Sequence, residues 1–311
     1  MAGVDNAAAN RSRPQITDRA GRVVRLAQPF QRIISLYGAH TENLFALGAD
    51  AAVIGVTRHD TYPPAVRRKT VFSYHDGLER FLAATPDLVL IRPMIDRGYA
   101  PLIKGLEKNG ITVISLQPAA ANDMYDYWRV LGLLTGREVQ AAAQIAAFQQ
   151  ALRAFQNLTK GIHPRQRVYF EAIHKRMKTF TPGAMPIFAL EAAGGINVAA
   201  DAERVRNTNI AFYGKERILS RAAEIDVYLA QRGAMNQPTI ALITSEPGFA
   251  VIKAVQNGRI CIVDEALVAR PTRRLLVGID QIGRCLYPAL FETRGQRILE
   301  RAGFLPAAAD N

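Results

Sequence analysis

The sequence lacks the long apolar segment that a transmembrane helix requires. A helix that crosses a bilayer needs about 18 consecutive apolar residues, and the longest helical pattern here contains Arg129, Arg137 and Glu138. The first residues, MAGVDNAAANRSR, have neither the basic start nor the apolar core of a secretory signal. We expect residues 1–13 to form a disordered leader. The protein is then either cytoplasmic or an exported protein whose signal has been removed.

Cysteine is scarce, with only Cys261 and Cys285 in the chain. The two do not form a C-x-x-C motif, which argues against a structural zinc site. Cys261 falls in a strand-like run and Cys285 in a helix-like run. Two buried thiols are favoured over one disulfide, because a buried free cysteine behaves as a small hydrophobic residue. The sequence leaves both possibilities open.

Motifs of catalysis and metal binding are also missing. There is no G-x-x-x-x-G-K loop, no G-x-S-x-G turn and no G-x-G-x-x-G segment after a strand. The histidines form no H-x-H or H-x-x-x-H pair, so direct metal binding is disfavoured; they are His40, His59, His75, His163 and His174. We therefore expect no catalytic residues, no protein metal site and no enzymatic activity.

Positive charge is abundant. Against 27 acidic residues stand 39 Lys and Arg, giving a net charge of +12 and a pI of about 10. Such a balance attracts nucleic acid, an anionic membrane surface or a negatively charged ligand. The basic clusters at 67–69, 174–178 and 270–274 are shorter than a nucleic-acid-binding element requires. We expect no nucleic-acid partner, and each cluster is equally compatible with a solvated surface.

Strand and helix patterns alternate in both halves of the chain, which predicts βαβ units and mostly parallel sheets. The expected strands are 32–36, 52–56, 88–91, 112–116, 168–173, 226–230, 239–243 and 259–263. The expected helices are 42–47, 78–83, 99–109, 186–193, 216–222, 249–256, 273–286 and 294–302. Thr41 would cap the first helix, which places Glu42 on its first turn.

Residues 122–160 interrupt this alternation with helical spacing alone. Thr135 and Glu138 form a T-x-x-E pattern that indicates a new helix. It would run from about Arg137 to about Leu158, roughly 30 Å. The sequence thus predicts an α/β protein of two Rossmann-like lobes with mostly parallel sheets, joined by one long rigid α-helix. The expected boundaries are 14–121 for the first lobe, 122–160 for the linking helices and 161–311 for the second, with a ligand in the cleft between lobes.

A series of short motifs follows in order along the chain. The opening ITDRAGRVVRLAQPFQRIISLYGAHTENLFALGA contains a small hairpin, then P-x-R-I-I-S-L and T-E-x-L-F-A-L-G patterns. ATPDLVLI, LEKNGITVISLQP, LEAAGGINVAAD and AVQNGRICIVDEALVARPTRRLLVGI follow. Together these motifs resemble the ligand-binding proteins of bacterial ABC importers with a single helical linker, which bind ferric siderophores, haem or cobalamin. The resemblance extends from about Gln15 to Ala302 and rests on the order and spacing of the motifs.

The resemblance implies an exported, monomeric protein, periplasmic or tethered to the cell surface, that delivers its ligand to an ABC permease. In this family one acidic residue near the top of each lobe docks onto permease arginines. Glu42 takes that position in the first lobe and Glu216 in the second. Paired charges of this kind set the register and rate of association. Without the resemblance, Glu42 is simply an acid favoured at a helix N-terminus.

Candidate ligand residues lie in loops after strands and are mostly aromatic or cationic. They are Tyr37, His40, Tyr62, Arg92, His174, Lys175, Arg176, Phe180, Tyr213, Phe249 and Arg270. This mixture suits an iron-siderophore-like, anionic metal chelate, because Arg and Tyr can hydrogen-bond its oxygens. We expect no resident cofactor. A cobalamin, corrinoid or haem ligand is the alternative, ahead of a bare transition metal or an oxyanion.

Overall fold

The computed structural model describes residues 14–205 and 208–304, and the expected leader at 1–13 lies outside them. The chain divides into two compact units. The first runs to Gln117 and resumes over Tyr127–Ala141, and the second comprises Pro118–Asp126 and the chain from Ala142 onward. Each unit has its own parallel sheet, as the alternation of strands and helices predicts.

The first unit contains a five-stranded sheet in the order β5-β4-β3-β6-β7, with every neighbouring pair parallel. Its strands are β3 (Ile33–Ser35), β4 (Val53–Val56), β5 (Thr70–Val71), β6 (Leu88–Ile91) and β7 (Thr112–Ser115). The central strands β3 and β6 are buried along their whole length. A short antiparallel hairpin precedes the sheet, formed by β1 (Gln15–Thr17) and β2 (Val23–Arg25).

Helices of the first unit connect these strands and supply part of its core. They are α1 (Gly38–Ala46), α2 (Leu78–Ala83), α3 (Pro93–Gly98) and α4 (Ala100–Lys108), with a 3-10 turn η1 (Pro64–Arg68). Phe81 of α2 and Leu106 of α4 pack in one apolar cluster with Phe72 and Ile103. The expected start of the first helix is wrong, because α1 begins at Gly38 with Tyr37 as its extended N-terminal cap residue.

The second unit contains a four-stranded parallel sheet in the order β10-β8-β13-β14. Its strands are β8 (Arg167–Glu171), β10 (Ile196–Asn197), β13 (Val227–Arg232) and β14 (Ile260–Asp264). A small antiparallel sheet in the order β11-β12-β9 lies in the same unit. Its strands are β11 (Glu203–Arg204), β12 (Ile210–Phe212) and β9 (Lys178–Phe180).

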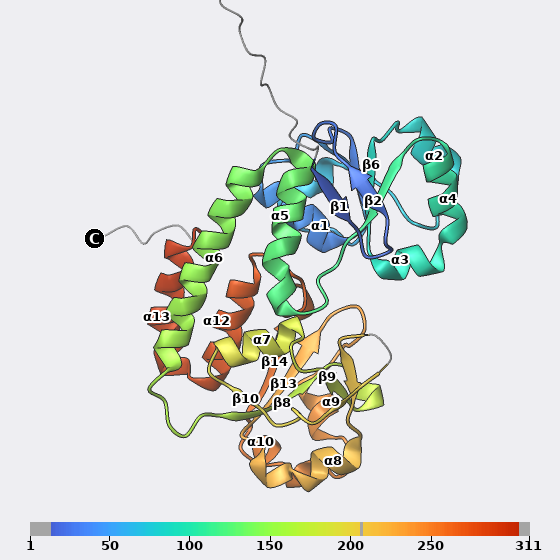
Figure 1. Cartoon of the computed structure of the whole chain (residues 1–311). Coiled ribbons are helices and arrows are strands. Elements are labelled where there is room, and N and C mark those ends of the chain that lie inside the picture. Colours follow the sequence, from blue (N-terminus) through green and yellow to red (C-terminus); the bar gives the residue numbers. More distant parts are fainter. Residues whose placement is uncertain (1–13, 206–207, 305–311) are drawn as a thin grey trace, which may run out of the picture. The chain divides into compact units, whose positions relative to one another are not determined.

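Short helices surround this sheet, and the last two, drawn in red in Figure 1, pack side by side. The helices are α7 (Met185–Ala192), α8 (Lys215–Ser220), α9 (Ile240–Thr244), α10 (Lys253–Gln256), α11 (Glu265–Val268), α12 (Leu275–Leu286) and α13 (Pro288–Arg301), with 3-10 turns η3 (His174–Arg176), η4 (Ala222–Glu224) and η5 (Phe249–Val251). The strand expected at 239–243 is wrong. Thr239 caps α9 there, because its hydroxyl accepts a hydrogen bond from the Leu242 amide at 3.0 Å.

The segment between the sheets consists of a 3-10 turn η2 (Ala121–Asp123), α5 (Met124–Thr135) and α6 (Glu138–Thr159). Figure 1 shows α6 as one unbroken helix, and its bounds agree with the helix expected between about Arg137 and about Leu158. The expected capping box is wrong. Thr135 ends α5, where its hydroxyl donates to the Leu131 carbonyl at 2.7 Å, and Gly136 follows in the left-handed region.

The two parallel sheets share one topology. In each unit the first strand, β3 or β8, lies between the next strand of the parallel sheet (β4 or β10) and a later one (β6 or β13). The last strand of each sheet, β7 or β14, pairs beyond that, and β5 is an additional strand of the first sheet beside β4. The helix before β6 is α2, and the helix at the corresponding place before β13 is α8. This correspondence identifies equivalent positions in the two units.

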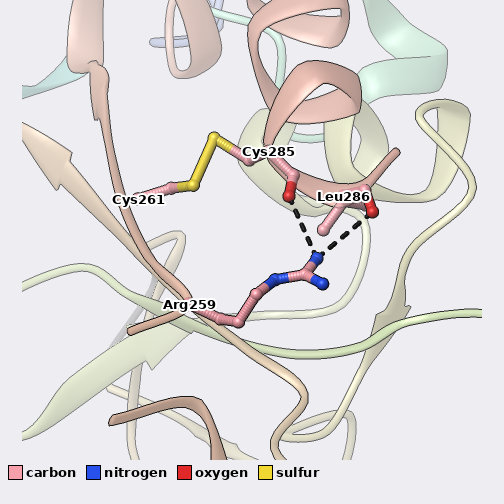
Figure 2. Close-up of a disulfide and its surroundings, with 4 residues drawn as sticks. All are labelled: Arg259, Cys261, Cys285 and Leu286. Carbon is pink, nitrogen blue, oxygen red and sulfur yellow. Dashed lines mark hydrogen bonds between the residues drawn. A yellow bond between two sulfur atoms is a disulfide. The ribbon is translucent and has the colours of Figure 1, made fainter. Parts of the chain in front are cut away.

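A disulfide joins Cys261 on β14 to Cys285 in the last turn of α12, with Cα atoms 6.2 Å apart (Figure 2). The favoured expectation of two buried thiols is therefore wrong. Beside the bridge, the Arg259 guanidinium donates to the carbonyls of Cys285 and Leu286, each at 3.2 Å (Figure 2). A cation at this position satisfies carbonyl groups that the helix leaves unpaired.

Candidate functional site

Tyr37 and Arg92 form a pair at the carboxyl edge of the first sheet. Tyr37 follows β3 and Arg92 directly follows β6, its neighbour in the sheet. The Arg92 guanidinium lies over the Tyr37 ring, 5.1 Å from its centroid, and both side chains are half-buried. Parallel α/β sheets bind ligands beyond the carboxyl ends of their strands. This pair is therefore placed where a ligand could meet both a ring face and a fixed positive charge.

His40 lies in the core of the first unit and does not belong to an exposed ligand surface. Its side chain is fully buried; Nδ1 lies 2.7 Å from the Tyr127 hydroxyl and Nε2 lies 3.0 Å from the Ile91 carbonyl. These partners suit a neutral ring that accepts from Tyr127 and donates to Ile91. Burial lowers the pKa of His40 to about 4, and the nearby positive charge of Arg92 acts in the same direction. The expectation that His40 contacts ligand is corrected accordingly.

Aromatic side chains cluster farther along the same edge. Tyr74 and His75 follow β5, and Tyr99 stands between α3 and α4. Ring centroids lie 4.6 Å apart for Tyr74 and Tyr99 and 5.0 Å for His75 and Tyr99. His75 and Tyr99 were not among the expected ligand residues. They are 24 positions apart in the chain, and the sequence alone does not predict that their side chains are in contact. Tyr62, an expected contact, follows β4 and is 39% exposed.

The expected ligand residues of the second unit separate into exposed and buried groups. Lys175 and Arg176 are exposed in η3, just beyond β8. His174, at the start of η3, is only 3% exposed. Arg270, two residues after α11, is half-buried, and its carbonyl accepts from the Thr272 amide at 2.8 Å.

Three aromatic side chains expected to contact ligand are core residues. Tyr213 and Phe249 belong to the apolar cluster of the second unit. Phe180 packs edge-on against Phe170, with centroids 5.1 Å apart, and is 2% exposed. Their burial corrects the expectation of direct contact, since a fully packed ring offers no face to a ligand.

The profile of one protein family, described as periplasmic binding protein, matches residues 33–267. The chain belongs to the periplasmic binding protein family. The match covers both parallel sheets, from β3 to β14, and the residues of both sheet edges. Membership of this family, together with a lipoprotein among its relatives, places the protein in the periplasm or on the cell surface.

Individual relatives of this periplasmic binding protein cover most of its length. An uncharacterised ABC transporter substrate-binding lipoprotein of Bacillus subtilis is 26% identical over 282 residues, covering 89% of this chain and 86% of the relative. A vitamin B12-binding protein of Vibrio cholerae is 24% identical over 267 residues, covering 84% and 91%. The crystal structure of a possible iron-binding, periplasmic solute-binding protein of Staphylococcus epidermidis shares 27% identity with a TM-score of 0.74, covering 84% of this chain and 100% of that one.

Of the two expected docking acids of the periplasmic binding protein, only Glu216 is accessible. Glu216 is exposed on α8, whereas Glu42 is 4% exposed within α1, whose residues Gly38–Leu44 are all buried. The expectation for Glu42 is corrected, because a side chain with so little exposed surface offers almost nothing to a partner's arginine.

Glu79 is the residue of the first unit that corresponds to Glu216. It is exposed at the second position of α2, the helix equivalent to α8. The local sequences are Gly-Leu-Glu-Arg-Phe-Leu at 77–82 and Gly-Lys-Glu-Arg-Ile-Leu at 214–219. In both, the glycine precedes the helix and the residue two after the acid, Phe81 or Ile218, is fully buried. This shared G-x-E-R pattern makes the correspondence between Glu79 and Glu216 visible in the sequence.

Over residues 14–205 and 208–304, no helix combines the length and apolar character needed to cross a bilayer. Within the same part of the chain, His, Cys, Asp and Glu side chains form no group of three or more that could hold a metal ion.

Proposed function

We propose that this periplasmic binding protein is the substrate-binding component of an ABC importer. It captures an anionic metal chelate of the iron-siderophore type and delivers it to a membrane permease. The main support is the position of its cations: Arg92 directly follows β6 of one sheet, and Lys175 and Arg176 lie just beyond β8 of the other. The carboxyl ends of parallel strands are where α/β proteins bind ligands. Guanidinium groups there would make charge-assisted hydrogen bonds to chelate oxygens.

The net charge of +12 favours the same ligand class, because a positive protein raises the local concentration of anions. A nearly neutral corrinoid gains little from such a field. The relatives are named for possible iron binding and for vitamin B12 binding, and a ferric chelate is compatible with the first of these names.

A planar macrocycle is the second candidate, supported by the cluster of Tyr74, His75 and Tyr99. Rings of this kind can pack against a haem or corrin surface, and aromatic pairs add about 0.5–1.5 kcal/mol beyond area burial. Calorimetric titration separates the two candidates. The panel is the ferric complex of a hexadentate tris-catecholamide, cobalamin, haemin and molybdate. The proposal expects the ferric complex to bind at least about tenfold more tightly than the others. A preference for cobalamin or haemin would replace it with the macrocycle assignment.

Docking to the permease is assigned to Glu79 and Glu216. Each is an exposed acid on a short helix at the equivalent position of its unit. Charge complementarity at such points fixes register and speeds encounter. Charge reversal at both, Glu79→Lys with Glu216→Lys, should stop chelate uptake by cells that carry only the variant, while calorimetric affinity stays unchanged. Glu292→Lys, an exposed acid on α13, is the matched control. Normal uptake by the double variant would exclude this docking pair.

A further inference from the structure

A buried polar cluster surrounds His174 in the second unit. His174 is 3% exposed, and its Nδ1 lies 2.7 Å from Oε2 of Glu171, a carboxylate with no exposed surface. On its other side, Nε2 lies 3.5 Å from Oε2 of Glu246. The imidazole thus stands between two carboxylates that come from different parts of the chain.

Glu171 is held in place by two further donors. The Tyr228 hydroxyl, from the neighbouring strand β13, donates to its Oε2 at 2.5 Å, and Asn236 donates to its Oε1 at 2.9 Å. Asn236 also accepts from the His174 backbone amide at 3.0 Å. Both Glu171 and Asn236 therefore restrain His174, one through its ring and the other through its main chain.

Glu246 connects the same imidazole to α8, the helix that carries Glu216. Its Oε1 forms an ion pair with Lys215, the first residue of α8 and the neighbour of Glu216. The amide of Gly214, just before α8, donates to the Met177 carbonyl at 3.1 Å. The segment after β8 and the start of α8 are thus joined by a charge contact and a backbone hydrogen bond.

His174 begins the turn that carries the exposed cations Lys175 and Arg176. The turn closes with the Met177 amide donating to the His174 carbonyl at 2.9 Å. Met177 adopts a left-handed conformation with φ of 46°, which costs a non-glycine residue about 1 kcal/mol or more. A turn of this shape needs a firm anchor, and the buried imidazole provides one.

We propose that Glu171 and Glu246 hold His174 as a positioning residue, so that Lys175 and Arg176 are fixed for an anionic ligand and the affinity for that ligand falls as pH rises. This inference rests on the proposed function. It goes further, because it names the residues that position the two cations, and it assigns the pH dependence of ligand affinity to the proton on the His174 ring.

Among the titratable and charged groups that face His174 from the neighbouring elements, the two carboxylates favour a protonated ring, and the Lys215 cation opposes it. These groups are Glu171 of β8, Tyr228 of β13, Glu246 after α9 and Lys215 of α8. The hydrogen bond to Glu171 raises the pKa of His174 above its usual 6.5, burial opposes this, and the charges of Glu171 and Glu246 add to it. Burial keeps the Tyr228 pKa well above its ordinary value, so Tyr228 stays a donor.

Loss of the proton weakens anion binding in two ways. A neutral ring that still donates from Nδ1 presents the Nε2 lone pair to the Glu246 carboxylate, and that repulsion loosens the turn. The positive charge of the imidazolium beside Lys175 and Arg176 is lost as well. Both effects act in the same direction, and both are half complete at the pKa of His174, which the two carboxylates raise above its usual value.

The test combines a titration without ligand and a binding series. The His174 ring is titrated by nuclear magnetic resonance in the intact protein and in Glu246→Gln. Calorimetry then gives the affinity for the ferric hexadentate tris-catecholamide from about pH 6 to about pH 9 in the intact protein, Glu246→Gln, His174→Gln and the exposed-histidine control His163→Gln.

The intact protein and His163→Gln should lose about tenfold in affinity across this range. Glu246→Gln should shift both the ring titration and the loss of affinity to lower pH, and His174→Gln should bind weakly at every pH. Identical pH profiles in the intact protein and Glu246→Gln, or a His174 that titrates at or below 6.5, overturn the inference. Absence of binding by the intact protein at every pH instead removes the proposed function on which it rests.

Discussion

His40 should make the first unit sensitive to acid. Its fully buried ring has a pKa of about 4 in the folded protein against 6.5 in an unfolded chain, because burial disfavours the charged form. The unfolded chain therefore binds more protons between these values, and stability falls as pH drops from 6.5 towards 4. At about 1.4 kcal/mol per pKa unit, the loss at about pH 4 is about 3 kcal/mol. The stabilisation is fully present above pH 6.5.

The assay is urea unfolding followed by the fluorescence of Trp128, the one tryptophan of the chain, which is buried in the same unit. His40→Gln removes the titrating group while keeping an amide that can meet the Tyr127 hydroxyl and the Ile91 carbonyl. The stability difference between the two proteins should shrink by about 3 kcal/mol from about pH 7.5 to about pH 4. A difference that changes by less than about 1 kcal/mol would refute the assignment of a buried neutral histidine.

Other substitutions test packing, the disulfide and the cations. Removing the bridge with Cys261→Ser and Cys285→Ser should lower the stability of the second unit by about 3.5 kcal/mol in urea unfolding followed by far-ultraviolet circular dichroism, the chain-entropy value for a sequence separation of 24; unchanged stability would argue against a bridge. Gly278→Ala should cost about 1–3 kcal/mol in urea unfolding followed by far-ultraviolet circular dichroism, because its Cβ would lie 2.4 Å from a carbonyl oxygen of α11; a neutral effect would contradict the close packing of α12. Arg92→Ala and Arg270→Ala should each weaken chelate binding by more than about 1 kcal/mol in calorimetry; an unchanged dissociation constant removes that arginine from the site.

The sheets were predictable because parallel buried strands leave strong signals in sequence. Runs such as Leu88–Ile91 are apolar at every position, and turn residues bound them. The segment 239–243 shows the limit of this signal. A short apolar run fits either a strand or a buried helix, and the side-chain cap of Thr239 decides for the helix. The residue types from Gly38 to His40 likewise do not predict the helical turn that α1 forms before Thr41.

The site was only partly predictable, because position after a strand does not reveal burial. Tyr37 and Arg92 are paired at the expected sheet edge. His40, equally close to that edge in sequence, turns inward to satisfy a backbone carbonyl and a tyrosine. The equivalence of Glu79 and Glu216 follows from the G-x-E-R pattern that both short helices share, and this pattern is visible in the sequence.

The identity of the captured solute tests the central claim most directly. Native mass spectrometry of the protein purified from its own organism would retain a bound ligand and report its mass. The proposal predicts an adduct whose mass is that of an iron complex with a non-macrocyclic, oxygen-donor ligand. A corrinoid or haem mass would contradict the anionic chelate and support the macrocycle assignment, and an oxyanion adduct would contradict both.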